Sequence, residues 1–314
     1  MSNKRTEQTV LLKKKAKELG FSACGIAAAH PLGADSIHLE KWVEKGYYAG
    51  MEYMSRNTEK RLDPSLLVEH TKSIISVALN YYPAQVLTKE QLQFSYYSYG
   101  KDYHVVMKQK LQALFDYIHE ELLPIQGRVF CDTAPVLERY WAQQAGLGWI
   151  GKNTQLIIPG AGSYFFLGEL FLDAAFDYDE PMQERCGTCQ RCIDACPTHA
   201  LEKPHLLNAA TCLSYLTIEH RGEIAPAQQK TIRKSIYGCD ICLQECPWNR
   251  FATPSKVEEF TASEAFLAMQ KEDWEKLTRE EYQVLFKGSA VKRAKYEGLQ
   301  RNIKALLANC KKEE

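Results

Sequence analysis

The chain has 314 residues, of which 45% are hydrophobic, and its 39 basic and 39 acidic side chains cancel. This length and composition indicate a globular chain with a substantial core, and the zero net charge excludes a bulk field that would attract nucleic acid. Residues 1–9 are polar and lack a signal core, and no stretch reaches the roughly 18 apolar residues of a membrane span. We therefore expect a soluble, cytoplasmic protein with no membrane partner.

The first predicted elements alternate between helix and strand. Residues 6–19 carry apolar side chains at helical spacing and stop at Gly20, which predicts an amphipathic surface helix. The apolar run 73–79 predicts a buried strand. A long helix is expected to begin after Asp102, a favourable N-cap, and to close at Pro124.

The next elements complete the first half of the chain. Residues 128–131 predict a short strand, and residues 136–145 predict a helix that ends at Gly146. Residues 155–158 and 164–172 flank a turn rich in glycine and proline, which predicts a hairpin.

Beyond Pro181 the pattern changes to cysteine-rich turns and short helices, with no strand of comparable length expected. This change predicts three parts of different character. They are a sheet domain over residues 1–180, a cysteine-rich domain over residues 181–255 and a helical segment over residues 256–314.

Eight of the eleven cysteines lie between Cys186 and Cys246. The first run has the C-x2-C-x2-C-x3-C-P spacing of bacterial ferredoxins, and the second repeats C-x2-C-x3-C-P after one isolated cysteine. In two-cluster ferredoxins the last cysteine of a run binds the other cluster. The spacing therefore predicts two 4Fe-4S clusters, one held by Cys186, Cys189, Cys192 and Cys246 and the other by Cys196, Cys212, Cys239 and Cys242.

Disulfides and zinc are the other common uses of grouped thiols. Disulfide frameworks are typical of small exported chains, which this chain does not resemble. Structural zinc also accepts paired C-x2-C units, but a proline after each x3 partner is not zinc-ribbon spacing. Zinc remains the alternative to iron–sulfur clusters, and Cys24, Cys131 and Cys310 are assigned no role.

The most distinctive segments outside the cysteine runs are Cys-Asp-Thr-Ala-Pro-Val-Leu-Glu-Arg at 131–139 and Ala-Gly-Leu-Gly-Trp-Ile-Gly-Lys-Asn at 145–153. They occur with Ser-Tyr-Gly-Lys-Asp-Tyr-His at 98–104, Tyr-Leu-Thr-Ile-Glu at 215–219 and Tyr-Gly-Cys-Asp at 237–240. In this order, and together with both cysteine runs, these motifs closely resemble the epoxyqueuosine reductase family over nearly all of the chain.

The resemblance implies a cobalamin-dependent enzyme that reduces epoxyqueuosine to queuosine at the wobble position of tRNA, the last step of queuosine biosynthesis. It implies an α/β (α+β) fold, in which a nitroreductase-like, cobalamin-binding sheet domain precedes a ferredoxin-like double 4Fe-4S domain and a helical C-terminus. The implied partners are a tRNA anticodon loop carrying epoxyqueuosine and an external low-potential electron donor. We expect a monomer.

Asp132 matches the proton donor of the family. A buried carboxyl has a raised pKa and can protonate a leaving oxygen near neutral pH. From the residues alone, Asp132 is equally well explained as the cap of a helix that begins near Pro135. The cobalamin contacts that the resemblance implies are Arg61, Ser98, Asp132, Leu156, Leu167, Ser214, Cys239 and Asp240.

Two local features favour tRNA binding despite the zero net charge. His220 and Arg221 match a segment that the family uses near the anticodon, and residues 287–312 contain eight basic side chains against one acid, Glu297. Without the resemblance, the basic segment reads as an ordinary solvated helix. The predicted tRNA contacts are His220, Arg221, Lys292, Arg293 and Lys295.

Three alternatives stay open from the sequence. A reductive dehalogenase-like enzyme would use the same cofactors but is typically exported behind a twin-arginine signal, which residues 1–9 lack. A ferredoxin-type electron-transfer protein would need only the last third of the chain. Flavin could replace cobalamin, since the implied sheet domain is nitroreductase-like.

Overall fold

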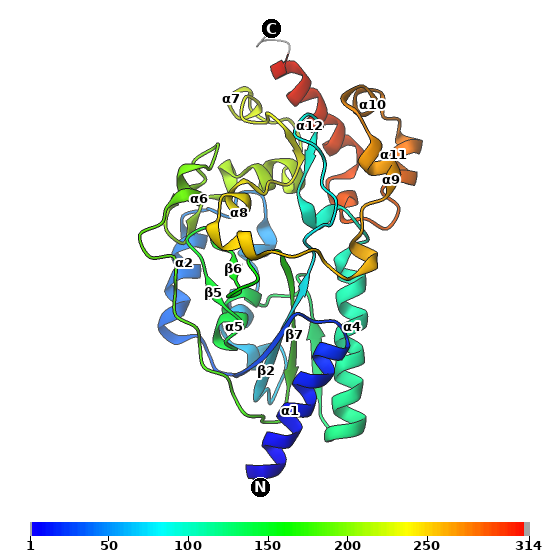
Figure 1. Ribbon diagram of the computed structural model, residues 1–314. Coiled ribbons are helices and arrows are strands. Elements are labelled where there is room, and N and C mark those ends of the chain that lie inside the picture. The colour runs from blue at the N-terminus through cyan, green and yellow to red at the C-terminus, as the bar shows by residue number, and fades with distance from the viewer. Residues whose placement is uncertain (1, 311–314) are drawn as a thin grey trace.

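The computed structural model describes residues 2–310, and its lower half in Figure 1 is built on a four-stranded antiparallel sheet. The strand order is β1-β2-β7-β4, so the two longest strands occupy the centre. The strands are β1 (Ala23–Ala28), β2 (Ser73–Asn80), β7 (Phe165–Leu172) and β4 (Gly127–Phe130).

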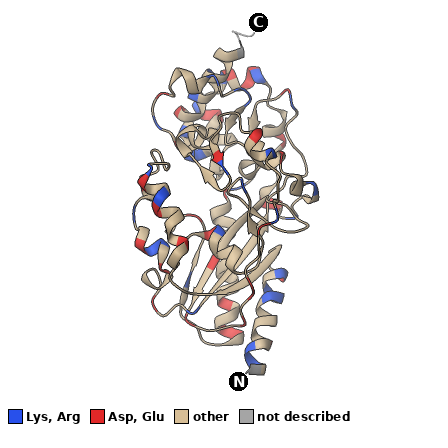
Figure 2. Ribbon diagram, turned by 90° about the vertical axis from the view of Figure 1, so that its left-hand side faces the viewer, with Lys and Arg blue, Asp and Glu red and all other residues tan. Residues whose placement is uncertain are grey.

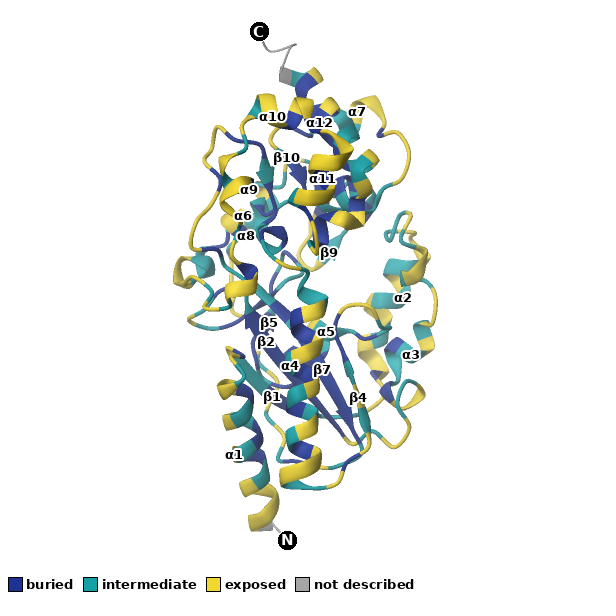
Figure 3. Ribbon diagram, turned by 90° about the vertical axis from the view of Figure 1, so that its right-hand side faces the viewer, coloured by how far each residue is buried: buried dark blue, intermediate teal, exposed yellow. Residues whose placement is uncertain are grey.

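Both faces of this sheet are covered, which explains why successive residues of β2 are buried rather than every second one. On one face, Ile75, Val77 and Leu79 pack against α1 (Ser2–Glu18) and α4 (Tyr103–Tyr117). On the other face, Ile74 and Ala78 pack against α5 (Glu138–Gln144). Figure 3 shows the central strands as the most buried part of this half.

The helices α1 and α4 confirm the predictions made from their apolar spacing. Leu12 and Ala16 of α1 are fully buried, and α1 ends just before Gly20, whose φ of +91° favours glycine. The Asp102 side chain caps α4 by accepting the backbone N–H of His104 at 3.0 Å. The helix continues into a π-helical turn over Ile118–Leu122.

Strand β1 was not expected, because its sequence, Ala-Cys-Gly-Ile-Ala-Ala, is made mostly of small residues. The small residues allow α5 to approach closely. A Cβ at Gly25 would lie 1.9 Å from the carbonyl oxygen of Ala145. The helix expected over 136–145 begins at Glu138, two residues later than the pattern indicated.

The prediction of a hairpin over residues 155–172 is wrong. Strand β6 (Leu156–Ile157) pairs with β5 (Trp149–Ile150), outside the main sheet. Strand β7 instead lies between β2, which pairs with it along its whole length, and β4, which pairs with residues 169–172. Pairing between strands distant in the chain decides this arrangement, and a local turn signal does not report it.

The cysteine-rich part of the second half consists of short elements, as its pattern predicted, whereas the last described helix, α12 (Lys295–Cys310), has 16 residues. The short elements connect to helices that gather at the top of Figure 1 near the C-terminal end. The remaining elements are α2 (Ser36–Glu44), α3 (Thr58–Leu62), β3 (Gln93–Phe94), α6 (Arg191–Asp194), β8 (Leu201–Lys203), β9 (Leu206–Leu207), α7 (Pro226–Gln229), β10 (Ser235–Tyr237), α8 (Ile241–Gln244), α9 (Glu264–Ala268), α10 (Lys271–Lys276), α11 (Arg279–Leu285) and α12 (Lys295–Cys310).

A segment of the first half joins the core of the second. Strand β3 pairs in parallel with β10, and Phe94 packs against Trp274 and Phe286 of the C-terminal helical region. Residues 87–99 thereby link the two halves through one hydrophobic cluster. Over the described residues, no helix has both the length and the apolar character needed to cross a membrane.

Candidate active site and iron–sulfur ligands

The structure brings the thiol of Cys246 next to the first cysteine run, although more than fifty residues separate Cys192 from Cys246 in the chain. Burial and the neighbouring thiolates of Cys246, Cys186 and Cys189 together raise the pKa of Cys192 to about 11. Burial also raises the pKa of Cys246, with contributions from Cys186 and Cys189. These four thiols therefore form one electrostatic group.

A second group forms around Cys239. Burial and the thiolates of Cys212 and Cys196 together raise its pKa to about 12. The pKa of Cys242 is raised well above its usual value by burial and by Cys239 and Cys212. Within the described residues, no group of three His, Cys, Asp or Glu side chains is placed to hold a single metal ion. A cubane cluster does not need such a group, because each of its thiolates binds a different iron.

Lys152 and Asn153 hold the two cysteine loops in place. The Lys152 Nζ donates to the carbonyl oxygens of Gly187 at 2.6 Å and Cys189 at 2.9 Å, inside the first run. Asn153 is buried and its Nδ2 donates to the carbonyl of Cys242 at 3.3 Å. The turn that carries both residues is thus a support for the thiol groups.

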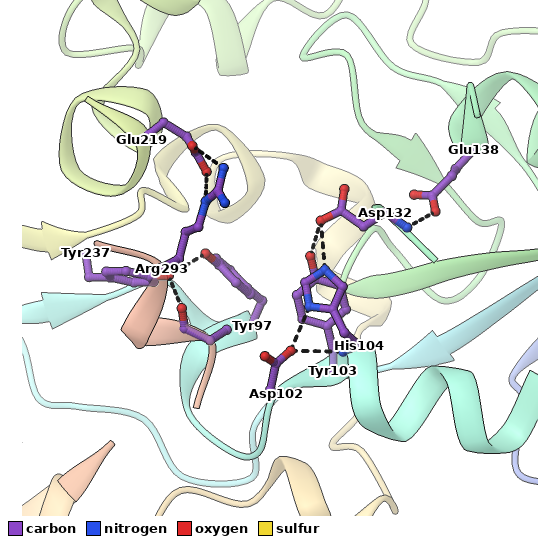
Figure 4. A network of polar contacts seen from close by, with 10 residues as sticks. Tyr97, Asp102, Tyr103, His104, Asp132, Glu138, Glu219, Tyr237 and Arg293 are labelled. Atoms are coloured by element: carbon purple, nitrogen blue, oxygen red, sulfur yellow. Dashed lines mark hydrogen bonds and ion pairs between the residues drawn. The ribbon is translucent and has the colours of Figure 1, made fainter. Parts of the chain in front are cut away.

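Asp132 follows strand β4 in a left-handed conformation, with φ at +58°. Its carboxylate accepts hydrogen bonds from the Tyr103 hydroxyl and from His104 Nε2, the latter at 3.3 Å. Its backbone N–H donates to the Glu138 carboxylate. The helix-cap reading is wrong, because α5 is preceded by Leu137 and has no side-chain cap. Figure 4 shows these contacts.

His104 connects Asp132 to Asp102, whose Oδ1 lies 2.7 Å from His104 Nδ1 (Figure 4). Burial alone would lower the pKa of His104, but hydrogen bonds and charge from both carboxylates outweigh it and raise the pKa to about 9. At neutral pH the imidazole is therefore protonated. Sequence reasoning used Asp102 only as a helix cap and missed His104, although the Asp-Tyr-His order at a helix start placed both at one site.

The prediction that the pKa of Asp132 is raised is wrong in direction. Burial pushes the pKa up, but hydrogen bonds from His104 and Tyr103 and the charge of His104 bring it below the usual value. The side chain also stays 57% exposed, which favours the ionised form. The proton of this pair consequently resides on His104, and Asp132 is its carboxylate partner.

The predicted tRNA contacts gather around one ion pair. The Arg293 guanidinium binds the Glu219 carboxylate through two hydrogen bonds of 2.8 and 2.7 Å. Hydrogen bonding to Glu219 raises the pKa of Arg293, and the charge of Asp132 contributes in the same direction. Figure 4 draws this pair together with the Asp132 network.

The other basic residues of this surface differ in their exposure and in their hydrogen bonds to the protein. Arg221 donates to the carbonyls of Ile218 and Arg293, and a His220 ring nitrogen lies 2.9 Å from the Glu223 carbonyl. Lys292 and Lys295 are exposed. Basic side chains elsewhere are spread over both halves (Figure 2). Two members of the predicted basic segment, Lys311 and Lys312, lie outside the described residues.

The predicted cobalamin contacts fall into two groups. Leu156 and Leu167 belong to the hydrophobic cluster on the α5 face of the sheet, which also includes Leu62, next to Arg61. Ser98 lies on the 87–99 segment, next to Asp240 of the second half, and Ser95 connects the two: Ser98 Oγ donates to the Ser95 carbonyl, and Ser95 Oγ donates to Asp240. Cys239 belongs to the second thiol group, and Ser214 follows its member Cys212.

Arg61 carries an unsatisfied donor. Its side chain is buried, its Nη2 donates to the carbonyl of Tyr53 at 2.9 Å, and its buried Nε has no hydrogen-bond partner among the described residues. Buried donors are nearly always paired. An absent polar group such as a corrin amide would satisfy this nitrogen, so the donor fits the cofactor that the resemblance implies.

Comparison with known proteins agrees with this chemistry. A family model for epoxyqueuosine reductase QueG, DUF1730, matches residues 61–133, and a model for a 4Fe-4S double cluster binding domain matches residues 185–249. The match to the 4Fe-4S domain indicates that the cysteine runs bind iron–sulfur clusters rather than zinc. In class, the chain is an iron–sulfur oxidoreductase.

The relatives identify the family. An epoxyqueuosine reductase from Leadbetterella byssophila is 47% identical over 292 residues, which cover 93% of this chain and 96% of the relative. The chain belongs to the epoxyqueuosine reductase family.

Solved structures of that family share the fold. One, with a tRNA-Tyr epoxyqueuosine-modified stem loop, is 30% identical with a TM-score of 0.89, covering 96% of this chain and 81% of that one. Another, from Bacillus subtilis, has a catalytic aspartate loop swung out of the active site. It is 29% identical with a TM-score of 0.89, covering 96% and 82%.

Proposed function

We propose that this chain reduces epoxyqueuosine to queuosine at the wobble position of tRNA, with Asp132 at the reacting oxygen. The observation that carries the proposal is the Asp102–His104–Asp132 network in the same chain as two groups of four thiols. A ferredoxin-type carrier would have no use for such a network. Family membership favours epoxyqueuosine over the halogenated substrates of a dehalogenase.

The two thiol groups are proposed to hold the clusters in the crossed arrangement. Cys186, Cys189, Cys192 and Cys246 would bind one cluster, and Cys196, Cys212, Cys239 and Cys242 the other. The second cluster is the inner one, since Asp240 and Ser214 beside its ligands belong to the proposed cofactor site. An external low-potential donor would then deliver electrons to the first cluster.

The proposed organisation is a nitroreductase-like, cobalamin-binding sheet domain over residues 1–180, a ferredoxin-like domain over 181–255 and a helical segment over 256–314. Arg61, Leu156 and Leu167 would hold cobalamin from the sheet side. Ser98, Ser214, Cys239 and Asp240 would hold it from the cluster side. When bound, cobalamin supplies the chemistry that reduces an epoxide carbon, which a cluster alone does not do.

Conversion of the epoxide to the alkene consumes two electrons and two protons and releases one water. The leaving oxygen needs a proton as its carbon–oxygen bond breaks. His104 holds a proton at neutral pH, and Asp132 lies between His104 and the open side of the site. We propose that the proton reaches the oxygen through Asp132, while Asp102 orients the imidazole and Tyr103 orients the Asp132 carboxylate.

The proposed RNA surface contains His220, Arg221, Lys292, Arg293 and Lys295. A wobble base in an anticodon loop is unpaired, so it can leave its stack to enter a protein site. The exposed Lys292 and Lys295 would contact phosphates. Arg293, which is already paired with Glu219, would face the substrate from the side opposite Asp132.

The test uses protein purified without oxygen, reduced chemically, and mixed with an anticodon stem-loop that carries epoxyqueuosine. With cobalamin added, we expect loss of one oxygen atom from the modified base by mass spectrometry, and about eight irons per chain. Conversion that requires flavin, or no conversion by fully loaded protein, would overturn the proposal.

A further inference from the structure

Asp132 is held at its backbone as well as at its carboxylate. The backbone N–H donates to Glu138, in the first turn of α5, and α5 packs on the sheet through Trp141 and Ala142. The turn between β4 and α5 is otherwise short of regular hydrogen bonds: within it, the N–H groups of Thr133 and Val136 donate to the carbonyls of Cys131 and Ala134. Glu138 thus ties the Asp132 turn to the buried scaffold.

The conformation of Asp132 explains why such a tie is needed. Residues other than glycine seldom adopt a left-handed conformation, although aspartate tolerates it better than most. Such a conformation persists where surrounding contacts favour it over its alternatives. A backbone hydrogen bond from Asp132 itself is the most direct contact of this kind.

A second buried carboxyl lies behind Glu138. Glu169, in the centre of β7, is fully buried and has no hydrogen-bond partner for either carboxylate oxygen among the described residues. Ser76, opposite it on β2, also has a buried hydroxyl without a partner there. Burial and the charge of Asp132 raise the pKa of Glu138 to about 8, and burial and the charge of Glu138 raise the pKa of Glu169 well above its usual value.

We infer that Glu138 is a positioning residue for Asp132: its side-chain carboxyl accepts the backbone N–H of Asp132 and thereby fixes the Asp132 turn. Glu138 touches neither the substrate nor the cofactor in this role. It acts by keeping the Asp132 carboxylate within reach of Tyr103 and His104. The kinetic part of the inference rests on the proposed function of Asp132, and the structural part does not.

The test compares three variants of the full cluster-loaded protein. Glu138→Ala removes the acceptor, Glu138→Gln keeps an acceptor oxygen, and Glu169→Gln is a matched control that changes the neighbouring buried carboxyl without touching the Asp132 N–H. Iron content and thermal unfolding identify any variant that has not folded. Hydrogen exchange of the peptide covering residues 131–137 measures the turn without any substrate.

For Glu138→Ala we expect exchange of that peptide to rise roughly tenfold, the effect of losing one hydrogen bond. The kcat on the stem-loop should fall by a similar factor with KM unchanged, because binding does not involve Glu138. Glu138→Gln should restore most of both losses, and Glu169→Gln should exchange like the wild type.

Wild-type exchange in folded Glu138→Ala would overturn the inference, as would Glu138→Gln behaving like the alanine variant. Equal loosening in Glu169→Gln would also overturn it, because the buried pair as a whole would then hold the turn. If hydrogen exchange changes as expected but no variant converts the stem-loop, the structural part of the inference stands and the proposed function fails.

Discussion

The sheet half and the cysteine loops of the second half are stabilised by different means. In the sheet half, hydrophobic clusters cover both faces of β2 and β7, so these strands are almost completely buried (Figure 3). Around the first cysteine run, the apolar core is small and consists of Trp149, Ile157 and the thiol Cys246 itself. The helices there, α6 and α8, have four residues each. The sheet half therefore has the means to fold on apolar burial, while the cysteine loops depend on bound metal.

Removal of iron gives the largest expected effect of this difference. Because metal binding supplies folding free energy to small cysteine-rich units, chelation should increase hydrogen exchange in α6 and α8 by about two orders of magnitude or more. Strands β2 and β7 should keep their protection. Equal loss of protection in both regions would show that the two halves form one cooperative unit.

The crossed ligand set sharpens this prediction. Cys246→Ala should release roughly half of the iron and loosen residues 186–192, although the substituted residue lies far along the chain. Cys24→Ala, which removes a thiol outside both groups, is the matched control. Loss of protection confined to the loop of Cys196 and Cys212 would contradict the crossed set.

The sheet half supplies the proton chemistry, and Asp132→Asn tests it. We expect turnover to fall by roughly 100- to 10,000-fold, the range for loss of a general acid, with iron and cobalamin content unchanged. Asp116→Asn, an exposed carboxyl in the last turn of α4, is the control. Near-normal turnover in Asp132→Asn would limit Asp132 to a structural role.

The same contrast explains which features the sequence could predict. Helices α1 and α4 bury apolar residues at helical spacing, β2 is a mostly apolar run, and the thiol spacing is itself a chemical pattern, so all were accessible from the residues. Strand β1 consists of small residues that are buried only because β2 and α5 cover them. The position of β7 between β2 and β4 depends on pairing across more than forty residues, which no local signal encodes.

The electrostatics of the site were also beyond sequence reasoning. Proximity to a strand end suggested a buried Asp132 with a raised pKa. The structure places Tyr103 and His104 against its carboxylate, and these donors lower the pKa instead. The sign of such a shift depends on which groups face one another in three dimensions.

The pH dependence follows from His104. Its pKa of about 9 lies above the usual value, so the protonated form is present at neutral pH and is lost as pH rises through 9. We expect kcat to fall above that pH. His104→Gln should lower kcat roughly 10- to 100-fold and remove this alkaline limb. His119→Gln, in the π-helical turn that follows α4, is the control, and an unchanged limb in His104→Gln would assign it to another group.

The smallest expected effect concerns the RNA surface of the second half. Arg293 is paired with Glu219, so its replacement would leave a carboxylate unpaired. An effect on RNA binding could then not be separated from an effect on the protein structure. Lys292 and Lys295 are exposed and suit a cleaner test. If each contacts one phosphate, replacing both by alanine should reduce the steepness of the logarithmic salt dependence by about 1.4 to 1.8.

The control for this test is the double variant Lys14→Ala and Lys17→Ala, which removes two exposed charges from α1 in the sheet half. Both double variants change net charge equally, so a general electrostatic effect would affect them alike. We expect only the Lys292 and Lys295 variant to bind the stem-loop more weakly, with kcat at saturation unchanged. An equal loss in both variants would mean that the RNA responds to the overall field of the protein, and the surface near Arg293 would lose its special role.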